Sequence, residues 1–461
     1  MKLDREAGGS GTAGGAAAAF SFLWAGALLA HQVFYGVATA TVWDALLTAA
    51  ALAVMAAPGA AWGLPVLCAA HGAAVWQAMP GAPNHWFFSG LVSLGVVLAW
   101  AAARGRRDAV ASGLPELARW CLAAVYFFTG FHKLNTSYFT PGLSCGELLY
   151  GQLRKAVPVL PEADWAGMAG AGVGAGMELA LALALAAWPG GRCWVALAGV
   201  LFHTALGLMR YRRFSLIAFA LLAAAAPEVG ARLAEWARLW MPAWVRRAGA
   251  AAAWSGAVMV LAAVLGMKGP WRWMAAHVGE PGEILGFVPA AVVLAACAGS
   301  VAWRGRWGNV QAGPAWSFPK AAWPALALML LSGAAPYLGL QTLNAFAMYS
   351  NLRTEGGRSN HLVVPGGWQP FGYQRELVHV EETNVPALRA VKERRMVAPL
   401  EEVRAAVRRQ AAQGRRAVCV VTGRGGRQVV EERPGEADSG WRGKWLRFRP
   451  VEESGGRACS L

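Results

Sequence analysis

The chain of 461 residues is 56% hydrophobic and 15% charged, and its mean hydropathy is +0.37. An average soluble domain carries about a quarter charged residues, so this composition excludes a string of soluble domains, a disordered chain, a collagen and a small disulfide scaffold. Stretches of about 20 residues run almost without charge, among them 20–40 and 321–340, and each can cross the hydrocarbon core of a bilayer as a helix. The composition therefore predicts an integral membrane protein.

The net charge of +16 is spread unevenly along the chain. The 120 residues from 342 onward carry 33 charged side chains, against 35 in the first 341 residues, so we expect a membrane body followed by a soluble tail. Arginine clusters stand at the ends of apolar segments, for example at 104–107 and 210–213, where membrane insertion and anionic headgroups favour basic residues. The positive charge thus predicts contact with a lipid bilayer and no nucleic-acid partner.

Residues 1–18 are expected to form a flexible tail, and residues 19–341 a membrane domain. Its apolar segments cover residues 20–40, 43–58, 63–79, 86–103, 114–135, 165–188, 193–209, 214–228, 250–267, 283–303 and 321–340. Their period is helical and lacks the alternation of a barrel, which predicts an all-α polytopic bundle of about nine to eleven spans. The segment 227–247, with Trp236, Trp240 and Trp244 beside arginines, predicts an amphipathic interfacial helix.

The part after residue 341 predicts a polar juxtamembrane segment (342–370), a small α/β tail domain (371–450) and a frayed C-terminus (451–461). In the tail we expect strands at 376–381, 416–422 and 428–432 and an amphipathic helix at 400–412. The last two of these strands would form a hairpin across the turn Gly423–Gly426, and a further short strand is expected at 445–448.

Known catalytic and metal-binding patterns are absent from the sequence. The seven cysteines are scattered, and their spacing indicates no zinc, iron–sulfur or disulfide framework. There is no HExxH run, no Ser-His-Asp order and no dinucleotide fingerprint. We therefore expect no metal and look for function in the ionisable residues of the apolar segments.

Lys133 is the most informative of these residues, because it ends the apolar run that begins near Tyr126. Helical spacing places Thr129 and Tyr126 one and two turns earlier on the same face. A lysine in a medium of low dielectric loses its proton readily and can then act as a base. The alternative is a snorkelling lysine whose stem covers apolar surface while its amine reaches the headgroups.

Glu178 lies deep in an apolar segment, after a glycine-rich run at 170–176 that permits close helix packing. Such a carboxylate needs a partner, and Lys133, an imidazole or an arginine are the alternatives. Asn84 and His85 open another apolar segment after Pro83. They predict either a helix cap with an interfacial imidazole or a hydrogen-bonding group that faces the interior.

The run from 344 to 361 concentrates polar side chains directly after the last span. It contains Asn351, Arg353, Arg358 and His361 within eleven residues. Its composition is that of a solvated juxtamembrane loop, but its glycines and alternating donors also suit a loop that folds back over a site.

The run from Tyr126 to Asn135 resembles the vitamin K-dependent gamma-carboxylase family and, more broadly, bacterial proteins with the HTTM (horizontally transferred transmembrane) domain. By this resemblance Lys133 corresponds to the base that deprotonates vitamin K hydroquinone. The run 83–90 is similar to a family motif whose histidine lies at the active site, which corresponds to His85. The segment 346–361 resembles the one that follows the family's last span, and Asn351 and Arg353 match it.

The resemblance implies a quinol-dependent membrane oxygenase or carboxylase-like enzyme in which Lys133 and His85 are catalytic. Tyr126, Asn84, Glu178 and the polar segment would bind substrate or tune the lysine. The reactants would be a reduced quinone of the vitamin K type, O2 and CO2, with a peptide or a small molecule as second substrate. The composition suggests a multi-pass protein of a bacterial inner membrane. The alternative is a non-enzymatic membrane protein that binds lipid or quinone, or that acts in export or as a scaffold.

Overall fold

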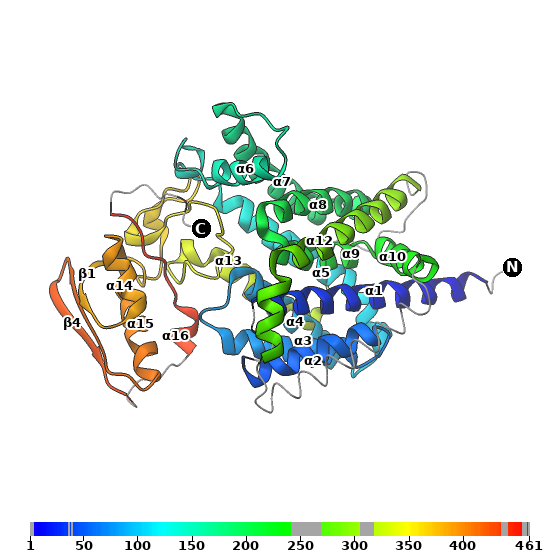
Figure 1. Cartoon of the computed structure of the whole chain (residues 1–461), viewed down its shortest axis with the longest axis horizontal. Coiled ribbons are helices and arrows are strands. Elements are labelled where there is room, and N and C mark those ends of the chain that lie inside the picture. The colour runs from blue at the N-terminus through cyan, green and yellow to red at the C-terminus, as the bar shows by residue number, and fades with distance from the viewer. Residues whose placement is uncertain are drawn as a thin grey trace. The chain divides into compact units, whose positions relative to one another are not determined.

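The computed structural model describes residues 4–35, 37, 40–240, 269–304, 318–434, 441–453 and 459. The chain is mostly helical and carries one small antiparallel sheet near its C-terminus (Figure 1), as the sequence predicts. Before the sheet the α-helices are α1 (Asp4–Phe34), α2 (Val42–Ala56), α3 (Gly63–Ala78), α4 (Asn84–Ala102), α5 (Arg107–His132), α6 (Cys145–Ala156), α7 (Asp164–Ala187), α8 (Arg192–Leu206), α9 (Arg212–Ala225), α10 (Pro227–Trp240), α12 (Gly269–Arg304) and α13 (Trp323–Leu338).

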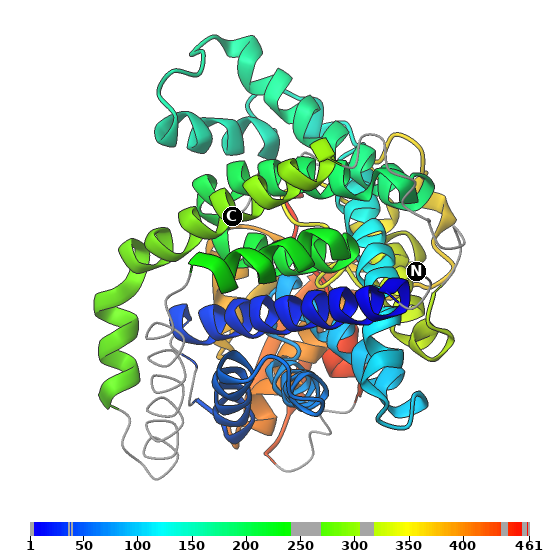
Figure 2. The same cartoon turned by 90° about the vertical axis from the view of Figure 1, so that its right-hand side faces the viewer.

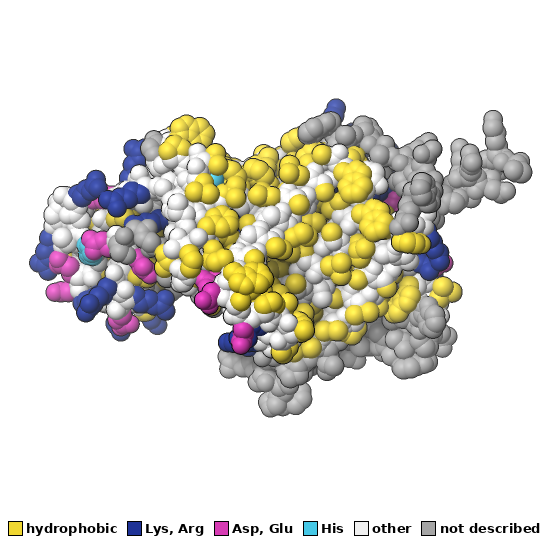
Figure 3. Space-filling view, turned by 90° about the horizontal axis from the view of Figure 1, so that it is seen from above, with side chains coloured by type: hydrophobic (Ala, Val, Ile, Leu, Met, Phe, Trp, Pro, Cys, Tyr) yellow, Lys and Arg dark blue, Asp and Glu magenta, His cyan; other side chains and the backbone are white. Residues whose placement is uncertain are grey.

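Six stretches in the described part of the chain are long and apolar enough to cross a membrane. They are Gly14–Phe34, Asn84–Ala102, Asp164–Ala187, Pro189–Ala225, Phe287–Arg304 and Lys320–Leu338. Their number and composition indicate a multi-pass membrane protein. Large apolar side chains on them remain exposed, as lipid-facing side chains do, and Figure 3 shows such side chains spread over the visible face of the helices.

The six stretches are fewer than the nine to eleven expected, for identifiable reasons. The helices α2 and α3 have only 15 and 16 residues. The expected segment 114–135 lies largely in α5, which is not among the six stretches. The segments 193–209 and 214–228 fall within the one stretch Pro189–Ala225, which is irregular at Gly207–Tyr211. The segment 250–267 lies outside the described residues, and so does Trp244 of the expected interfacial helix, whose described part is α10. At the other end, α1 begins at Asp4, where a flexible tail was expected.

The structure divides into two compact units whose segments alternate along the chain. Unit 1 consists of residues 1–77, 88–124 and 180–328, and unit 2 of residues 78–87, 125–179 and 329–461. The units thus do not divide at residue 341, because unit 2 combines the tail with three segments of the expected membrane domain, 78–87, 125–179 and 329–341. All of the residues that the sequence singled out for the site belong to unit 2.

In unit 1, α1 packs along α2, α9 and α10, and α8 packs against α9 and α12 (Figure 2). Buried polar side chains of this unit have structural partners. The Nδ1 atom of His71 lies 2.9 Å from Ser93 Oγ, and its Nε2 atom lies 3.3 Å from Ser89 Oγ. These hydroxyls satisfy an imidazole that is fully buried, so His71 needs no functional explanation.

The tail in unit 2 is an antiparallel sheet in the order β2-β1-β3-β4. Its elements are β1 (Leu377–Thr383), α14 (Pro386–Glu393), β2 (Val397–Pro399), α15 (Leu400–Ala412), β3 (Ala417–Gly423), β4 (Gly426–Glu432) and α16 (Trp441–Trp445). The helices α14 and α15 cover one face of the sheet (Figure 1), and the buried valines of β1 alternate with exposed polar residues. The helix at 400–412 and the hairpin between β3 and β4, which ends at Gly423 and Gly426, confirm the prediction.

The prediction of a strand at 445–448 is wrong. Residue Trp445 ends α16, and the chain after it is irregular. The backbone N–H of Phe448 donates to Glu402 Oε2 at 2.9 Å, and Arg447 forms an ion pair with the same carboxylate. Because a carboxylate of α15 satisfies this backbone, no neighbouring strand is needed.

Candidate functional site

Lys133 and Glu178 form a buried ion pair in unit 2. Lys133 stands in the turn directly after α5, and Glu178 projects from α7. The Nζ atom of Lys133 lies 2.6 Å from Glu178 Oε2 and 3.2 Å from the backbone oxygen of Thr129. The Lys133 side chain is only 6% exposed and that of Glu178 12% exposed. The structure thus selects Lys133 from the three partners expected for Glu178.

The pair overturns the alternative of a snorkelling lysine. A snorkelling amine lies in the headgroup region, whereas the amine of Lys133 is turned inward onto a carboxylate and a carbonyl oxygen. Two of its three donor positions are therefore occupied by protein acceptors. An ion pair in such surroundings is costly to desolvate, so it stabilises the fold little compared with apolar side chains of similar size.

A glycine brings the two helices of the pair together. A side chain at Gly130 would place its Cβ 2.8 Å from Cγ of Leu179 and 3.2 Å from Cβ of Glu178. Only glycine allows this approach, because real Cβ contacts are longer. Within the glycine-rich run, Gly170 similarly faces the ring of Tyr150. The close packing expected of this run is therefore met at Gly170, whereas Gly172 and Gly176 face open space.

His132 links the end of α5 to the segment that follows α13. Its Nδ1 atom lies 2.8 Å from the hydroxyl of Tyr337, and its Nε2 atom lies 2.8 Å from the backbone oxygen of Ala345. A carbonyl oxygen can only accept, so Nε2 carries the proton and Nδ1 accepts from the Tyr337 hydroxyl. His132 is therefore a neutral structural residue that fixes the backbone next to Lys133.

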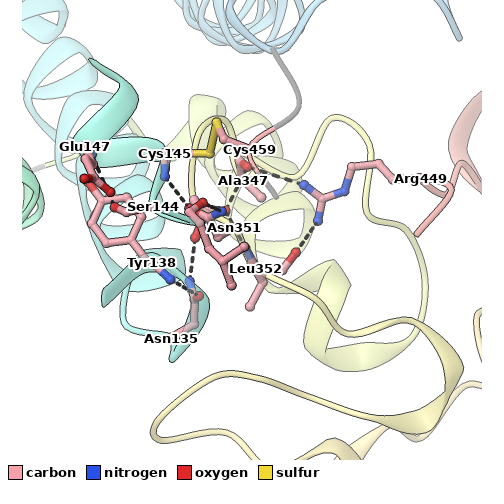
Figure 4. Close-up of a disulfide and its surroundings, with 12 residues drawn as sticks. Asn135, Tyr138, Ser144, Cys145, Glu147, Ala347, Asn351, Leu352, Arg449 and Cys459 are labelled. Carbon is pink, nitrogen blue, oxygen red and sulfur yellow. Dashed lines mark hydrogen bonds between the residues drawn. A yellow bond between two sulfur atoms is a disulfide. The ribbon is translucent and has the colours of Figure 1, made fainter. Parts of the chain in front are cut away.

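Asn135 holds the polar segment against the turn that contains Lys133. Its Nδ2 group donates to the backbone oxygens of His132 and Ser350, and its Oδ1 atom accepts the N–H of Tyr138 at 2.9 Å (Figure 4). The same oxygen accepts from Nδ2 of Asn360 at 3.3 Å. Asn135 is fully buried, so each of these groups depends on its amide for a partner.

Asn351 and Asn360 complete this network from the segment itself. The Oδ1 atom of Asn351 accepts the N–H of Cys145 at 2.8 Å, and its Nδ2 group donates to the backbone oxygen of Leu143 at 2.8 Å (Figure 4). Asn360 donates to the backbone oxygen of Asn351 at 2.9 Å and accepts the N–H of Arg353 at 2.8 Å. We call Asn135, Asn351 and Asn360 the amide clamp. The segment 344–361 is therefore a folded part of unit 2 and not a solvated loop.

The clamped segment is conformationally strained. Of the seven non-glycine residues with positive φ in the described chain, four lie within eight residues, at Asn344, Phe346, Tyr349 and Asn351. Their φ angles are between 50° and 56°. The left-handed conformation costs L-residues about 1–2 kcal/mol, and bulky Phe and Tyr rarely adopt it. Such strain persists only where the surroundings impose it, and it gathers at functional sites.

His361 is held by hydrogen bonds to the backbone on both sides of its ring. Its Nε2 atom lies 2.9 Å from the backbone oxygen of Phe131, and its Nδ1 atom accepts the N–H groups of Val363 and Val364, each at 3.1 Å. Both nitrogens are thus used by the protein, in the neutral tautomer with the proton on Nε2. Burial lowers the pKa of His361, against the opposing effect of the bond to Phe131.

We expect stability to fall as the pH drops below about 6.5, where unfolded His361 gains a proton that the folded chain resists. Above that pH the contribution is complete, because both states are neutral. Thermal unfolding of the purified protein between pH 7.5 and 5 measures the effect. His361→Asn should flatten the pH dependence, and His379→Asn is the control, because His379 is half exposed on the sheet. Equal slopes in wild type and His361→Asn would contradict the prediction.

Arg353 is buried, at 3% exposed, but its Nε and Nη1 atoms have no hydrogen-bond partner among the described residues. Burial lowers its pKa, and the charge of nearby Glu355 opposes the shift. Glu355 is itself fully buried and also faces Arg449, whose Nε lies 3.7 Å from Glu355 Oε1. The charge of Glu355 therefore acts on two buried guanidinium groups, and it forms an ion pair with that of Arg449. Arg358 is exposed, and its positive charge adds to the lowering of the pKa of Arg353.

The remaining predicted residues lie at the start of α4 and in α5. The Oδ1 atom of Asn84 accepts the N–H of strained Phe346 at 3.3 Å, so Asn84 binds the segment. His85 is half buried in the first turn of the same helix. Tyr126 is buried in α5, and its backbone oxygen accepts the hydroxyl of Thr129. Asn351 and Arg353 thus belong to one folded segment, which Asn84 binds directly and which His132, the neighbour of Lys133, also contacts.

Sequence reasoning missed several residues that build this site. Asn135, Asn360 and Gly130 carry no local signal, because their partners lie in distant parts of the chain. It also missed the disulfide between Cys145 and Cys459, whose spacing of 314 residues follows no known framework (Figure 4). Among the described residues no group of three His, Cys, Asp or Glu side chains could hold a metal ion. Comparison of the chain with family models, with curated proteins and with solved structures finds no match.

Proposed function

We propose that this protein is a multi-pass membrane enzyme in which Lys133, paired with Glu178, accepts a proton from a lipid-soluble acid. The observation that carries the proposal is the 2.6 Å contact of these two buried side chains in a chain that is poor in charge. An ionisable residue inside a membrane domain is costly unless it is paired or functional. Here the pair also adjoins a strained segment, which a purely structural ion pair does not require.

The geometry supports a base. In a medium of low dielectric the uncharged pair, amine and carboxylic acid, competes with the ion pair because neither partner then bears a charge. A proton on Lys133 can pass directly to Glu178 Oε2 across the 2.6 Å contact. Lys133 can therefore present a neutral amine while Glu178 holds the proton, which is the state that a general base needs.

The substrate that we propose is a reduced quinone of the vitamin K type, by the resemblance of the run 126–135 to the gamma-carboxylases. The hydroxyl proton of the quinol would be taken up by Lys133 Nζ. The quinol, with O2, supplies an oxidation that can drive removal of a weakly acidic proton from a second substrate, which CO2 can then carboxylate. Asn84 and His85 would orient the ring, and Tyr126 would pack against it. The proposed location is a bacterial inner membrane.

The test is consumption of vitamin K hydroquinone by the purified full chain in lipid nanodiscs, with O2 and CO2 present. Lys133→Arg keeps the positive charge but cannot supply a neutral amine, so turnover should be lost while the protein remains folded. Lys155→Arg is the matched control, because Lys155 is exposed on α6. Turnover by Lys133→Arg at the wild-type rate would exclude the base. Quinol that binds to wild type without being consumed would favour the non-enzymatic alternative.

Arg353 would bind a carboxylate of the second substrate in this proposal. Without that anion two buried nitrogens of its guanidinium lack hydrogen-bond partners, which is costly, so Arg353→Met should melt at the same temperature as wild type or higher. With a glutamyl peptide at saturating concentration the order should reverse, because only wild type is stabilised by the ligand. Melting temperatures of both proteins, measured with and without the peptide, show whether the order reverses. A lower melting temperature for Arg353→Met in both conditions would show that Arg353 is structural.

A further inference from the structure

The disulfide between Cys145 and Cys459 fastens the C-terminal end of the chain to the start of α6 (Figure 4). The Cα atoms are 4.9 Å apart, within the range of disulfides. The N–H of Cys145 also donates to Asn351, so the disulfide adjoins the amide clamp. The other five cysteines are unpaired, and four of them lie in apolar helices. The fifth, Cys419, is buried in β3 of the tail. The disulfide thus joins two cysteines of unit 2 that lie outside the candidate spans.

Disulfides form and persist in oxidising compartments and are rare in the cytosol. Forming this bond removes two electrons and two protons from the two thiols. A disulfide-bearing oxidant of that compartment takes them up by thiol–disulfide exchange and is itself reduced to a dithiol. The disulfide thus reports which side of the membrane this part of the chain faces.

Three candidate spans have one end at the disulfide-bonded part of unit 2. The span Asn84–Ala102 begins at the residue that binds Phe346. The first half of Asp164–Ala187 packs against Cys145 through Ala171. The span Lys320–Leu338 continues directly into the clamped segment. A helix that crosses a bilayer places its two ends on opposite sides, so the other three ends should lie on the far side of the membrane.

Basic residues stand at each of those far ends. Arg104, Arg106 and Arg107 follow the first span, Arg192 follows the second, and Lys320 begins the third. Short connections rich in Lys and Arg stay in the cytoplasm, and long domains such as the tail do not count toward this bias. The connection 133–163, on the disulfide side, also carries basic residues, namely Arg154, which is paired with Glu162, and Lys155. The three arginines after α4 agree with the orientation that the disulfide indicates, and the disulfide carries the inference.

We infer that the connection 133–163, the clamped segment and the α/β tail face the extracytoplasmic, oxidising side of the membrane, and that the connections after α4 and α7 face the cytoplasm. This orientation does not depend on the proposed function. It adds to that function that Lys133, at the end of α5 on this side, exchanges its proton with the extracytoplasmic space and that a water-soluble second substrate arrives from there.

The first test counts thiols in the full chain as it is made in bacterial cells. Cells are quenched with acid, and the denatured protein is alkylated with a polyethylene glycol maleimide before and after reduction. Wild type should gain five adducts without reductant, corresponding to the five free cysteines, and two more with it. The variant with Cys145→Ser and Cys459→Ser should gain five in both conditions. All seven adducts on unreduced wild type would overturn the inference.

The second test determines on which side of the membrane two exposed positions lie. Intact spheroplasts are labelled with a membrane-impermeant maleimide. In a chain whose native cysteines are replaced, Ala163→Cys lies before α7 and Arg106→Cys lies after α4, and both native residues are exposed. We expect Ala163→Cys to be labelled at once and Arg106→Cys only after permeabilisation. The reverse order, or equal labelling of both in sealed spheroplasts, would overturn the orientation while leaving the test of Lys133 untouched.

Discussion

Replacing Lys133 by methionine and Glu178 by leucine together is expected to give a folded protein without quinol turnover. Either replacement alone should destabilise the protein by about 3–5 kcal/mol, because it leaves one buried charge without its partner. The double replacement removes both charges and fills the space with apolar side chains, which is often neutral or stabilising. Chemical unfolding of the four proteins in detergent gives the coupling between the two sites as a double-mutant cycle.

This design separates catalysis from folding, which single variants cannot do. A structural ion pair predicts that the double variant is stable and still turns over; a proton-transfer centre predicts that it is stable and inactive. The pair Arg119–Glu116 of α5 is the control, since it is also partly buried, with 2.5 Å between Arg119 Nη2 and Glu116 Oε2. Glu116→Gln should leave turnover unchanged, whereas Glu178→Gln should reduce it. Equal turnover in the double variant and wild type would refute the proposed role of the pair.

The sequence could identify Lys133 because charge is scarce in the membrane part of the chain. Helical periodicity also placed Glu178 deep in an apolar segment and showed that it needs a partner. It could not choose that partner, because periodicity gives the face of a helix but not its distance from a neighbouring helix. That distance depends on Gly130, where a Cβ would meet Leu179, and glycine has no distinctive signal in so glycine-rich a chain.

The α/β tail was more predictable than the site because its signals are local. Alternating valines and a glycine turn define the hairpin of β3 and β4, whose paired residues are close in sequence. The strand expected at 445–448 failed because its apolar pattern is satisfied by packing, and Glu402, more than 40 residues earlier, takes up the N–H of Phe448. The disulfide and the amide clamp could not be predicted for the same reason, because their partners lie hundreds of residues apart in the sequence.

The amide clamp yields the second large effect, because Asn135 satisfies four polar groups in a fully buried place. Asn135→Ala should lower the free energy of unfolding by about 3 kcal/mol, since buried groups such as the Tyr138 N–H lose their partner. Asn135→Asp should be nearly as harmful, because it turns an oxygen toward the carbonyl oxygens of His132 and Ser350. Thr136→Ala, at an exposed neighbour, should change stability by less than about 0.5 kcal/mol.

The clamp variants also test whether the strained backbone depends on this network. Left-handed conformations at Phe346 and Tyr349 persist only while the surroundings impose them, so a weakened clamp should let the segment relax. Amide hydrogen exchange of the detergent-solubilised protein should therefore rise across 344–361 in Asn135→Ala and stay at the wild-type level in Thr136→Ala. Because His132 bonds Ala345 within this segment, quinol turnover should fall with the lost protection. Exchange that rises equally throughout the chain would mean that Asn135 supports global stability and not the local conformation of the segment.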